Sequence, residues 1–143
     1  MTMSSPLFSQ QHVWVRPQGD TAILGMTAFA QDGVGDIIMV VLPTEGTLLS
    51  KGQVLVAGDC MDAYFELNTP ISGEIVVAHE EINDDPELIS RDPVSEGWLV
   101  EMFIADRREL DELFDEAAYA EYIVGRSLQA DIKWVRRDSL LWE

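Results

Sequence analysis

The chain alternates between hydrophobic and polar positions over short distances, and seven runs rich in β-branched and aromatic residues are strand candidates. These runs are residues 12–16, 21–25, 36–41, 53–59, 64–68, 73–77 and 98–104. Turn-forming residues separate the runs, as in Pro17-Gln18-Gly19-Asp20 and Pro43-Thr44-Glu45-Gly46. Short strands at this spacing predict a mainly β fold, a small sandwich or barrel of antiparallel strands.

Three other stretches favour helix. Residues 27–33 and 84–89 each predict one short turn of helix, the second with Asp84 or Asp85 near the N-cap and Pro86 in the first turn. A longer C-terminal helix is predicted over residues 106–123, because apolar residues recur there every three or four positions. Its opposite face is acidic, so we interpret it as a helix packed on the sandwich with a solvated face, rather than as a dedicated binding helix.

Composition narrows the class of protein. A chain of 143 residues with 47% hydrophobic residues fits one domain with a substantial core. The formal charge of −17 argues against nucleic acid and anionic membranes as partners and leaves proteins as the expected partners. The single cysteine, Cys60, excludes an intramolecular disulfide and favours a reducing cytoplasm. Residues 1–11 show no targeting signal, and no apolar run approaches the roughly 20 residues that span a bilayer.

A hairpin and several short motifs resemble one known family. Val56 to Val76 contains two strand-like runs, a tip at residues 60–63 and a Pro-x-Ser-Gly-Glu turn from Pro70. His12-Val13-Trp14, Leu24-Gly25-Met26-Thr27 with Ala30-Gln31, Pro86-Glu87-Leu88 and Gly97-Trp98-Leu99 lie in matching order along the chain. Together they resemble the glycine cleavage system H protein, over residues 10–124. The resemblance implies a barrel-sandwich hybrid fold like that of lipoyl domains, in a domain of residues 10–124 followed by a C-terminal extension of residues 125–143.

By resemblance, an ordinary H protein shuttles a methylamine group on a lipoyl arm between the enzymes of glycine cleavage. Counting back from Pro70 without insertion, the family's lipoyl lysine falls on Asp62 and the preceding glutamate on Asp59. An aspartate has no amine with which to form the lipoyl amide. We therefore expect no lipoate on this chain, no other cofactor and no enzymatic activity.

Other chemical groups give weaker signals. The two histidines, His12 and His79, lack the spacing of metal ligands and accompany no nucleophile motif, so structural roles are expected and no catalytic or metal-binding residue is predicted. Cys60 lies near the tip of the hairpin, where we expect exposure. Cys60 and Lys51 are the alternative positions at which a carried group can be attached.

The hairpin tip is the candidate partner surface, because exposed aromatic residues and methionine are enriched at protein interfaces. Its candidate contact residues are Asp59, Cys60, Met61, Asp62, Tyr64 and Phe65, although strand alternation directs either Tyr64 or Phe65 to the core. The main hypothesis is a non-lipoylated binding or regulatory module that docks on glycine-cleavage or other lipoyl-system enzymes. The alternative is a carrier with its group on Cys60 or Lys51.

The C-terminal extension differs in charge from the rest of the chain. Residues 126–143 have a net charge of +1 by count, against −18 for the body. Leu128, Ile132 and Val135 fit one side of a short helix, and Trp134 and Trp142 are further candidate contact residues because of their large apolar area. Either the extension docks on its own acidic body or it binds a partner.

Overall fold

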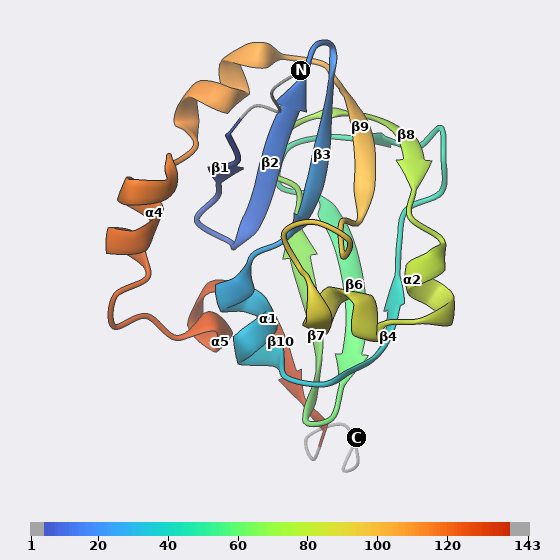
Figure 1. The fold of residues 1–143 in the computed structure, drawn as a ribbon, viewed down its shortest axis with the longest axis vertical. Coiled ribbons are helices and arrows are strands. Elements are labelled where there is room, and N and C mark those ends of the chain that lie inside the picture. Colours follow the sequence, from blue (N-terminus) through green and yellow to red (C-terminus); the bar gives the residue numbers. More distant parts are fainter. Residues whose placement is uncertain (1–4, 138–143) are drawn as a thin grey trace.

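The computed structural model describes residues 5–137, which form two antiparallel sheets with short helices around them (Figure 1). Sheet A has the strand order β1-β2-β3-β9-β8-β5 and sheet B the order β10-β7-β6-β4. The strands of sheet A are β1 (Leu7–Phe8), β2 (Val13–Gln18), β3 (Thr21–Met26), β9 (Val100–Ile104), β8 (Gly73–Ala78) and β5 (Leu48–Leu49). Those of sheet B are β10 (Lys133–Arg136), β7 (Ala63–Asn68), β6 (Val54–Cys60) and β4 (Ile37–Val41). The predicted mainly β fold is confirmed.

The core lies between the two sheets. Strand β7 shows how alternation builds it, since Ala63, Phe65 and Leu67 are buried and the residues between them are partly exposed. These side chains join one cluster with buried residues of sheet A such as Val15 and Leu24. All seven predicted strands are present within two residues of their predicted bounds. The prediction succeeds because burial of one face of a strand requires apolar residues at every second position.

The motif residue Trp14 organises a second, smaller cluster on sheet A. Its indole N–H donates to the carbonyl of Pro93 at 2.9 Å, which fastens the loop before β9 to β2. Gly25 lies directly across the ladder from Trp14, and a Cβ added there would come within 2.5 Å of the indole ring. Only glycine leaves room for that ring, which is the physical reason for the Trp14 and Gly25 pair.

The short helices are α1 (Ala28–Val34), α2 (Glu81–Asp84), α3 (Glu87–Arg91), η1 (Arg107–Glu112, a 3₁₀ helix), α4 (Glu116–Tyr122) and α5 (Leu128–Asp131). Helix α1 begins after Thr27, whose hydroxyl accepts from the N–H of Ala30 as an N-cap. The single turn predicted over residues 84–89 is wrong in its bounds. Asp85, at φ −145° and ψ 76°, is not helical and separates α2 from α3, in keeping with the rule that a proline disfavours the helical conformation of the residue before it.

The long helix predicted over residues 106–123 is also wrong in extent. It is interrupted after η1, where the backbone of Phe114 exchanges two hydrogen bonds with Phe8 of β1. Asp115 then caps α4 by accepting from the N–H of Ala118 at 2.8 Å. Pairing with β1 thus competes successfully with helix continuation, and a C-terminal helix remains in two shorter pieces.

Residues 128–136 do not form the single short helix that the apolar spacing suggested. One turn, α5, buries Leu128, and the chain then extends into β10, which pairs antiparallel with β7 at the edge of sheet B (Figure 1). Residues 128–136 of the extension therefore dock on the body of the chain. Among residues 5–137, no helix is long and apolar enough to cross a membrane.

Candidate functional site

The β6–β7 hairpin presents Met61 and Asp62 at an exposed tip between two buried residues, Cys60 and Ala63. The strands pair in register up to the tip, with Asp59 opposite Tyr64. The two residues of the turn therefore project beyond the end of sheet B (Figure 1). The exposed side chains of the tip are a thioether and a carboxylate.

Cys60 does not have the exposure that the sequence analysis expected. Its side chain is fully buried in the core, and its thiol donates to the carbonyl of Ala63 at 3.3 Å. The signal for this was present in the sequence, because Cys60 lies two and four residues after Gly58 and Val56, which face the core on the same strand. A buried thiol of this kind is not accessible to a partner or to a reagent in the folded chain.

Strand alternation also separates the two aromatic candidates. Phe65 is fully buried between the sheets, so it supports the hairpin from inside and does not offer a contact surface. Tyr64 lies on the outer face, and its hydroxyl donates to the Glu66 carboxylate at 2.6 Å. That hydrogen bond, with some burial, raises the pKa of Tyr64 to about 12. Tyr64 is thus a neutral phenol on the outer face beside Asp59.

The C-terminal extension covers the edge of this hairpin. Strand β10 places Val135 opposite Tyr64, Trp134 opposite Phe65 and Lys133 opposite Glu66. Trp134 is half-buried and packs against the core from the edge of the sheet. Of the two tryptophans predicted as contact residues, Trp134 thus serves the docking of the extension, and Trp142 lies outside the described residues.

Arg137 fastens the extension to the tip. Its guanidinium donates to the carbonyl of Cys60 at 2.7 Å and to that of Met61 at 3.1 Å, and its backbone N–H donates to the carbonyl of Asp62 at 2.7 Å. Three successive carbonyls of the turn thus have their hydrogen-bond partners in one residue of the extension. This contact fixes the backbone of the tip while leaving the side chains of Met61 and Asp62 exposed.

A buried hydrogen-bond chain joins the extension to the start of β2. His12 has a positive φ of 72° and is fully buried, and its ring nitrogens meet the Tyr119 hydroxyl and the Asp131 carboxylate, each at 2.8 Å. Thr27 reaches the same Tyr119 hydroxyl at 2.8 Å, and Arg126 donates to Asp131 at 3.0 Å. The structural role predicted for His12 is found, with partners from α1, α4 and α5.

The electrostatics of this chain favour a neutral His12. Burial lowers the pKa of His12, although the hydrogen bond and charge of Asp131 act in the opposite direction. Burial raises the pKa of Tyr119 to about 12, so Tyr119 keeps its proton and donates to His12 Nδ1. Nε2–H of the neutral ring then donates to Asp131. Burial acts to raise the pKa of Asp131, but hydrogen bonds from Arg126 and His12 lower it overall.

The second histidine is also structural. His79 stacks on Trp98 with ring centroids 4.1 Å apart, and its Nδ1 lies 2.6 Å from the carbonyl oxygen of Trp98. Within residues 5–137, no three His, Cys, Asp or Glu side chains form a cluster able to hold a metal ion.

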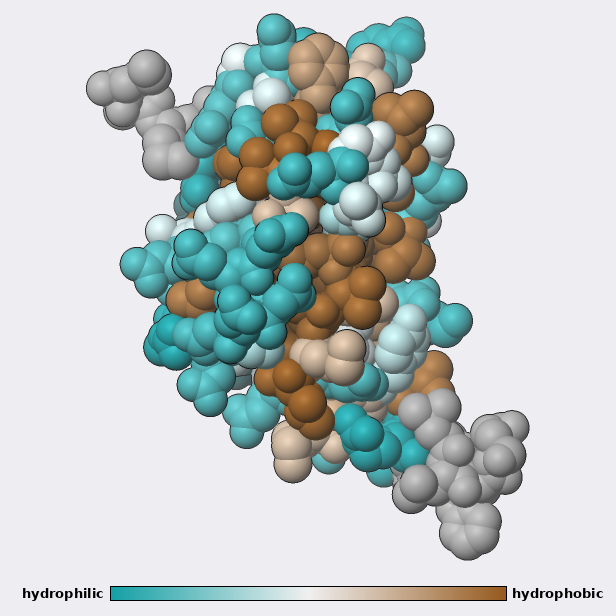
Figure 2. Space-filling view, turned by 90° about the vertical axis from the view of Figure 1, so that its right-hand side faces the viewer, coloured by the Kyte–Doolittle hydropathy of each residue, from teal (hydrophilic) through white to brown (hydrophobic). Residues whose placement is uncertain are grey.

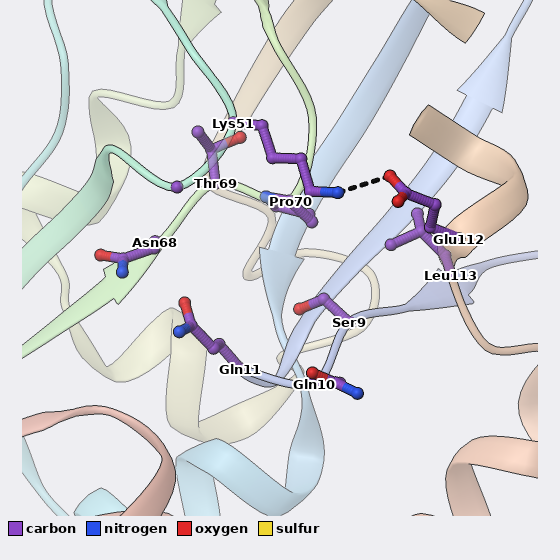
Figure 3. Close-up of a pocket in the computed structure, with 10 residues that line it drawn as sticks. Ser9, Gln10, Gln11, Lys51, Asn68, Thr69, Pro70, Glu112 and Leu113 are labelled. Atoms are coloured by element: carbon purple, nitrogen blue, oxygen red, sulfur yellow. Dashed lines mark hydrogen bonds and ion pairs between the residues drawn. The ribbon is translucent and has the colours of Figure 1, made fainter. Parts of the chain in front are cut away.

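An open pocket of about 360 Å³ lies at the other end of β7, near Asn68, Thr69 and Pro70 (Figure 3). Gln10 and Gln11 line it from the loop before β2, and the ammonium group of Lys51 pairs with the Glu112 carboxylate at its rim. Six residues of extended chain, roughly 20 Å, separate Asp62 from Asn68. Lys51, the predicted alternative attachment point, is therefore at the opposite end of the hairpin from the tip.

Sequence and structure comparisons agree on the family. The model of the glycine cleavage H-protein family matches residues 7–126. A probable glycine cleavage system H protein of Haloarcula marismortui is 38% identical over 116 residues, covering 81% of this chain and 91% of the relative. The glycine cleavage system H protein of Thermotoga maritima is 38% identical over 120 residues, covering 84% and 97%.

A solved structure gives the same result for the fold. The crystal structure of a glycine cleavage system H protein from Mycobacterium marinum superposes with a TM-score of 0.75 and 27% identity, covering 82% of this chain and 95% of that one. H proteins are carriers and not enzymes, in agreement with the expectation that this chain has no enzymatic activity. Helix α5 and strand β10 follow the last residue matched to the family, residue 126. The chain belongs to the glycine cleavage H-protein family.

Proposed function

We propose that this chain is a non-lipoylated H protein, a binding or regulatory module that docks on glycine-cleavage or other lipoyl-system enzymes without carrying the aminomethyl intermediate. The observation that carries the proposal is Asp62. It lies at the exposed tip of the β6–β7 hairpin, at the position that the count from Pro70 assigns to the lipoyl lysine. A carboxylate cannot form the amide by which lipoate is attached.

The positions of the two lysines also support the proposal. Lys51 lies in the turn before β6, where its ammonium group pairs with Glu112. That hydrogen bond raises the pKa of Lys51, which favours the protonated amine over the nucleophilic one. Lys133 is on β10, outside the part of the chain matched to the family, and is opposite Glu66 in the ladder. Neither lysine is at a hairpin tip.

The backbone contacts of the tip suit a docking surface held in one conformation. Arg137 holds the carbonyls of residues 60–62, and β10 lies along β7. A turn held in one conformation loses less conformational entropy when a partner binds it. The exposed side chains Met61 and Asp62, with Asp59 and Tyr64 beside them, then form the part of the surface that meets a partner enzyme.

The alternative carrier function, with a group on Cys60 or Lys51, has less support. Cys60 is buried and Lys51 is distant from the tip, as described above. We therefore propose that lipoate is absent and that the partners are proteins. The single cysteine further favours a reducing cytoplasm as the compartment.

The experiment compares lipoylation and binding in parallel. The chain, its Asp62→Lys variant and the Thermotoga maritima relative are each expressed with an active lipoate ligase and lipoate, and their intact masses are measured. We expect a lipoyl adduct on the relative, none on the chain, and partial modification of Asp62→Lys. The chain is then tested for binding to purified glycine-cleavage enzymes, with Met61→Ser as the tip variant.

The exposed Val124 supplies a matched control variant, Val124→Ser, because it lies beyond α4 and away from the hairpin. Binding that is weakened by Met61→Ser and retained by Val124→Ser supports the docking role. The docking role is ruled out if neither the chain nor Asp62→Lys binds any lipoyl-system enzyme. A lipoyl adduct on the unaltered chain would also rule out the proposal.

A further inference from the structure

Strand β4 is an apolar edge strand of sheet B. Its five residues, Ile37 to Val41, contain no charged side chain, and Ile38, Met39 and Val41 are 51%, 47% and 58% exposed. Among residues 5–137, β4 is the last strand of sheet B on this side, and no strand pairs with its outer edge. Figure 2 shows apolar side chains gathered in a band down the face on which β4, α2 and β8 lie.

Sheet edges of this kind normally carry protection. An edge strand is kept from pairing with another chain when it contains lysine or proline, when it is very short, or when another segment covers it. The other edge of sheet B has such protection, because its edge strand is β10, which carries Lys133 and Arg136. On β4 the neighbouring residues Ile38 and Met39 are both exposed next to a register shift at Ile37, so side chains on both faces of the strand reach solvent. An edge open on both faces is accessible to an added strand.

This edge is continuous with the hairpin tip. Met39 lies opposite Asp59 in the ladder, and the backbone N–H of Met61 donates to the carbonyl of Asp36, just before β4. Met61 is itself 60% exposed. We call Ile38, Met39, Val41 and Met61 the β4 patch. It extends the candidate docking surface from the tip along the edge of sheet B.

The charge around the β4 patch indicates which kind of chain can bind to it. Between Arg16 and Arg91 the sequence contains thirteen aspartates and glutamates and one basic residue, Lys51, which pairs with Glu112. Asp36, Asp59 and Asp62 border the patch, and helix α2 beside β4 adds the carboxylates of Glu81 and Asp84. A second copy of a chain with a net charge of −17 is repelled from such a surface, whereas a basic segment is attracted to it.

The chain itself contains a segment of the fitting type. Strand β10, Lys-Trp-Val-Arg, combines apolar and basic residues and pairs with β7, where Lys133 lies opposite Glu66. We propose that the β4 edge binds an extended segment of a partner protein in which apolar residues are mixed with lysine or arginine, added to sheet B as a further strand. This inference rests on the proposed docking function and supplies the chemistry of the partner.

The test uses the full chain and a peptide probe of defined sequence. The probe is an end-blocked peptide with the sequence of residues 132–137, Ile-Lys-Trp-Val-Arg-Arg, and its control has glutamate in place of every basic residue. Binding is followed by amide NMR shifts of the labelled full chain and by titration at two salt concentrations. We expect shifts confined to β4, β6 and the tip, weaker binding at high salt, and no binding of the glutamate peptide.

Two variants, at residues of similar exposure, distinguish binding at the β4 edge from unspecific apolar binding. Met39→Glu places a charge in the β4 patch and should weaken peptide binding about tenfold or more. Phe103→Glu is the control, because Phe103 is 50% exposed on sheet A and is as apolar as Met39. It should leave the affinity within about twofold, since it lies outside the patch.

Each other outcome overturns the proposal in a distinguishable way. Shifts on β7 and β10 mean that the peptide exchanges with the chain's own extension, and equal losses in both variants mean unspecific apolar binding. Self-association removed by Met39→Glu identifies a second copy as the occupant. Peptide binding that appears only after truncation at residue 137 identifies residues 138–143 as the occupant. A lipoyl adduct on the chain contradicts the proposed function separately, because it leaves the peptide result unchanged.

Discussion

Replacing Leu128 by alanine should release the C-terminal strand from the body of the protein. Leu128 is the buried residue of α5 and belongs to the core cluster that contains Phe65. It packs so tightly on α1 that a Cβ added to Gly33 would come within 2.7 Å of Leu128 Cδ2. Truncating the side chain therefore leaves an unfilled space between α1 and α5, at the start of the segment that leads to β10.

The size of the effect follows from burial and from chain position. Buried leucine-to-alanine substitutions cost about 2–5 kcal/mol, and a segment near the end of a chain can relax into part of the space, so we expect about 3 kcal/mol. The loss cannot exceed the free energy that docks residues 127–137. Beyond that limit the segment, including β10, detaches while the remaining strands of both sheets stay folded, so that amide exchange changes mainly within this segment.

Amide hydrogen exchange measures this directly. A loss of about 3 kcal/mol should accelerate exchange of the β10 amides by roughly 100-fold, with smaller effects on β2 and β3. Leu67→Ala is the control, because Leu67 is equally buried but lies between the sheets, and its loss should accelerate exchange throughout the core and lower the melting temperature further. A change of less than twofold in β10 exchange in Leu128→Ala, or opening of the β2 and β3 amides together with β10, would show that Leu128 does not hold this segment locally.

Three further predictions address the packing and the charges. Burial lowers the pKa of His12, so below about pH 6.5 the unfolded chain binds a proton at His12 more readily than the folded chain does. Through this group the free energy of unfolding keeps its full value above about pH 6.5 and decreases as the pH falls below it. Between pH 7 and 5 the melting temperature should therefore fall less steeply for His12→Asn, which tolerates the positive φ, than for the unaltered chain; equal slopes would contradict this. Gly25→Ala should lower the melting temperature by several degrees because its Cβ meets the Trp14 ring, and an unchanged value would show that the ring moves aside at little cost. Arg137→Gln should accelerate amide exchange at residues 60–63 without lowering the melting temperature by more than about 3 °C, whereas protection at the tip equal to that of the unaltered chain would mean that its contacts do not hold the turn.

The strands of the two sheets were predictable because each carries its own signal. A buried face selects apolar residues at a period of two, and turn residues mark where each strand ends. The same alternation placed either Tyr64 or Phe65 in the core, and Phe65 is the buried one. The assignment of Asp62 to the family's lysine position came from the resemblance, by a count back from Pro70, and the pairing of β6 with β7 places Asp62 at the hairpin tip.

The remaining features depend on contacts that no local pattern contains. Leu128, Ile132 and Val135 fit a helical spacing, but the open edge of β7 offers hydrogen-bond partners that favour an extended chain from Lys133 onward. The partners of His12 are 107 and 119 residues away in sequence. The break in the predicted helix comes from pairing of Phe114 with Phe8, which is likewise a tertiary contact. The burial of Cys60, by contrast, was predictable from the sequence, because Cys60 lies two residues after Gly58 and therefore on the same face of the strand.

The central claim, that this H protein has no lipoyl arm, is tested most directly by the intact mass of the chain purified from cells with active lipoate attachment. A lipoylated relative expressed in the same cells is the positive control. We predict a single species at the unmodified mass of 16.0 kDa. A species heavier by one lipoyl group, on Lys51, Lys133 or any other residue, would contradict it.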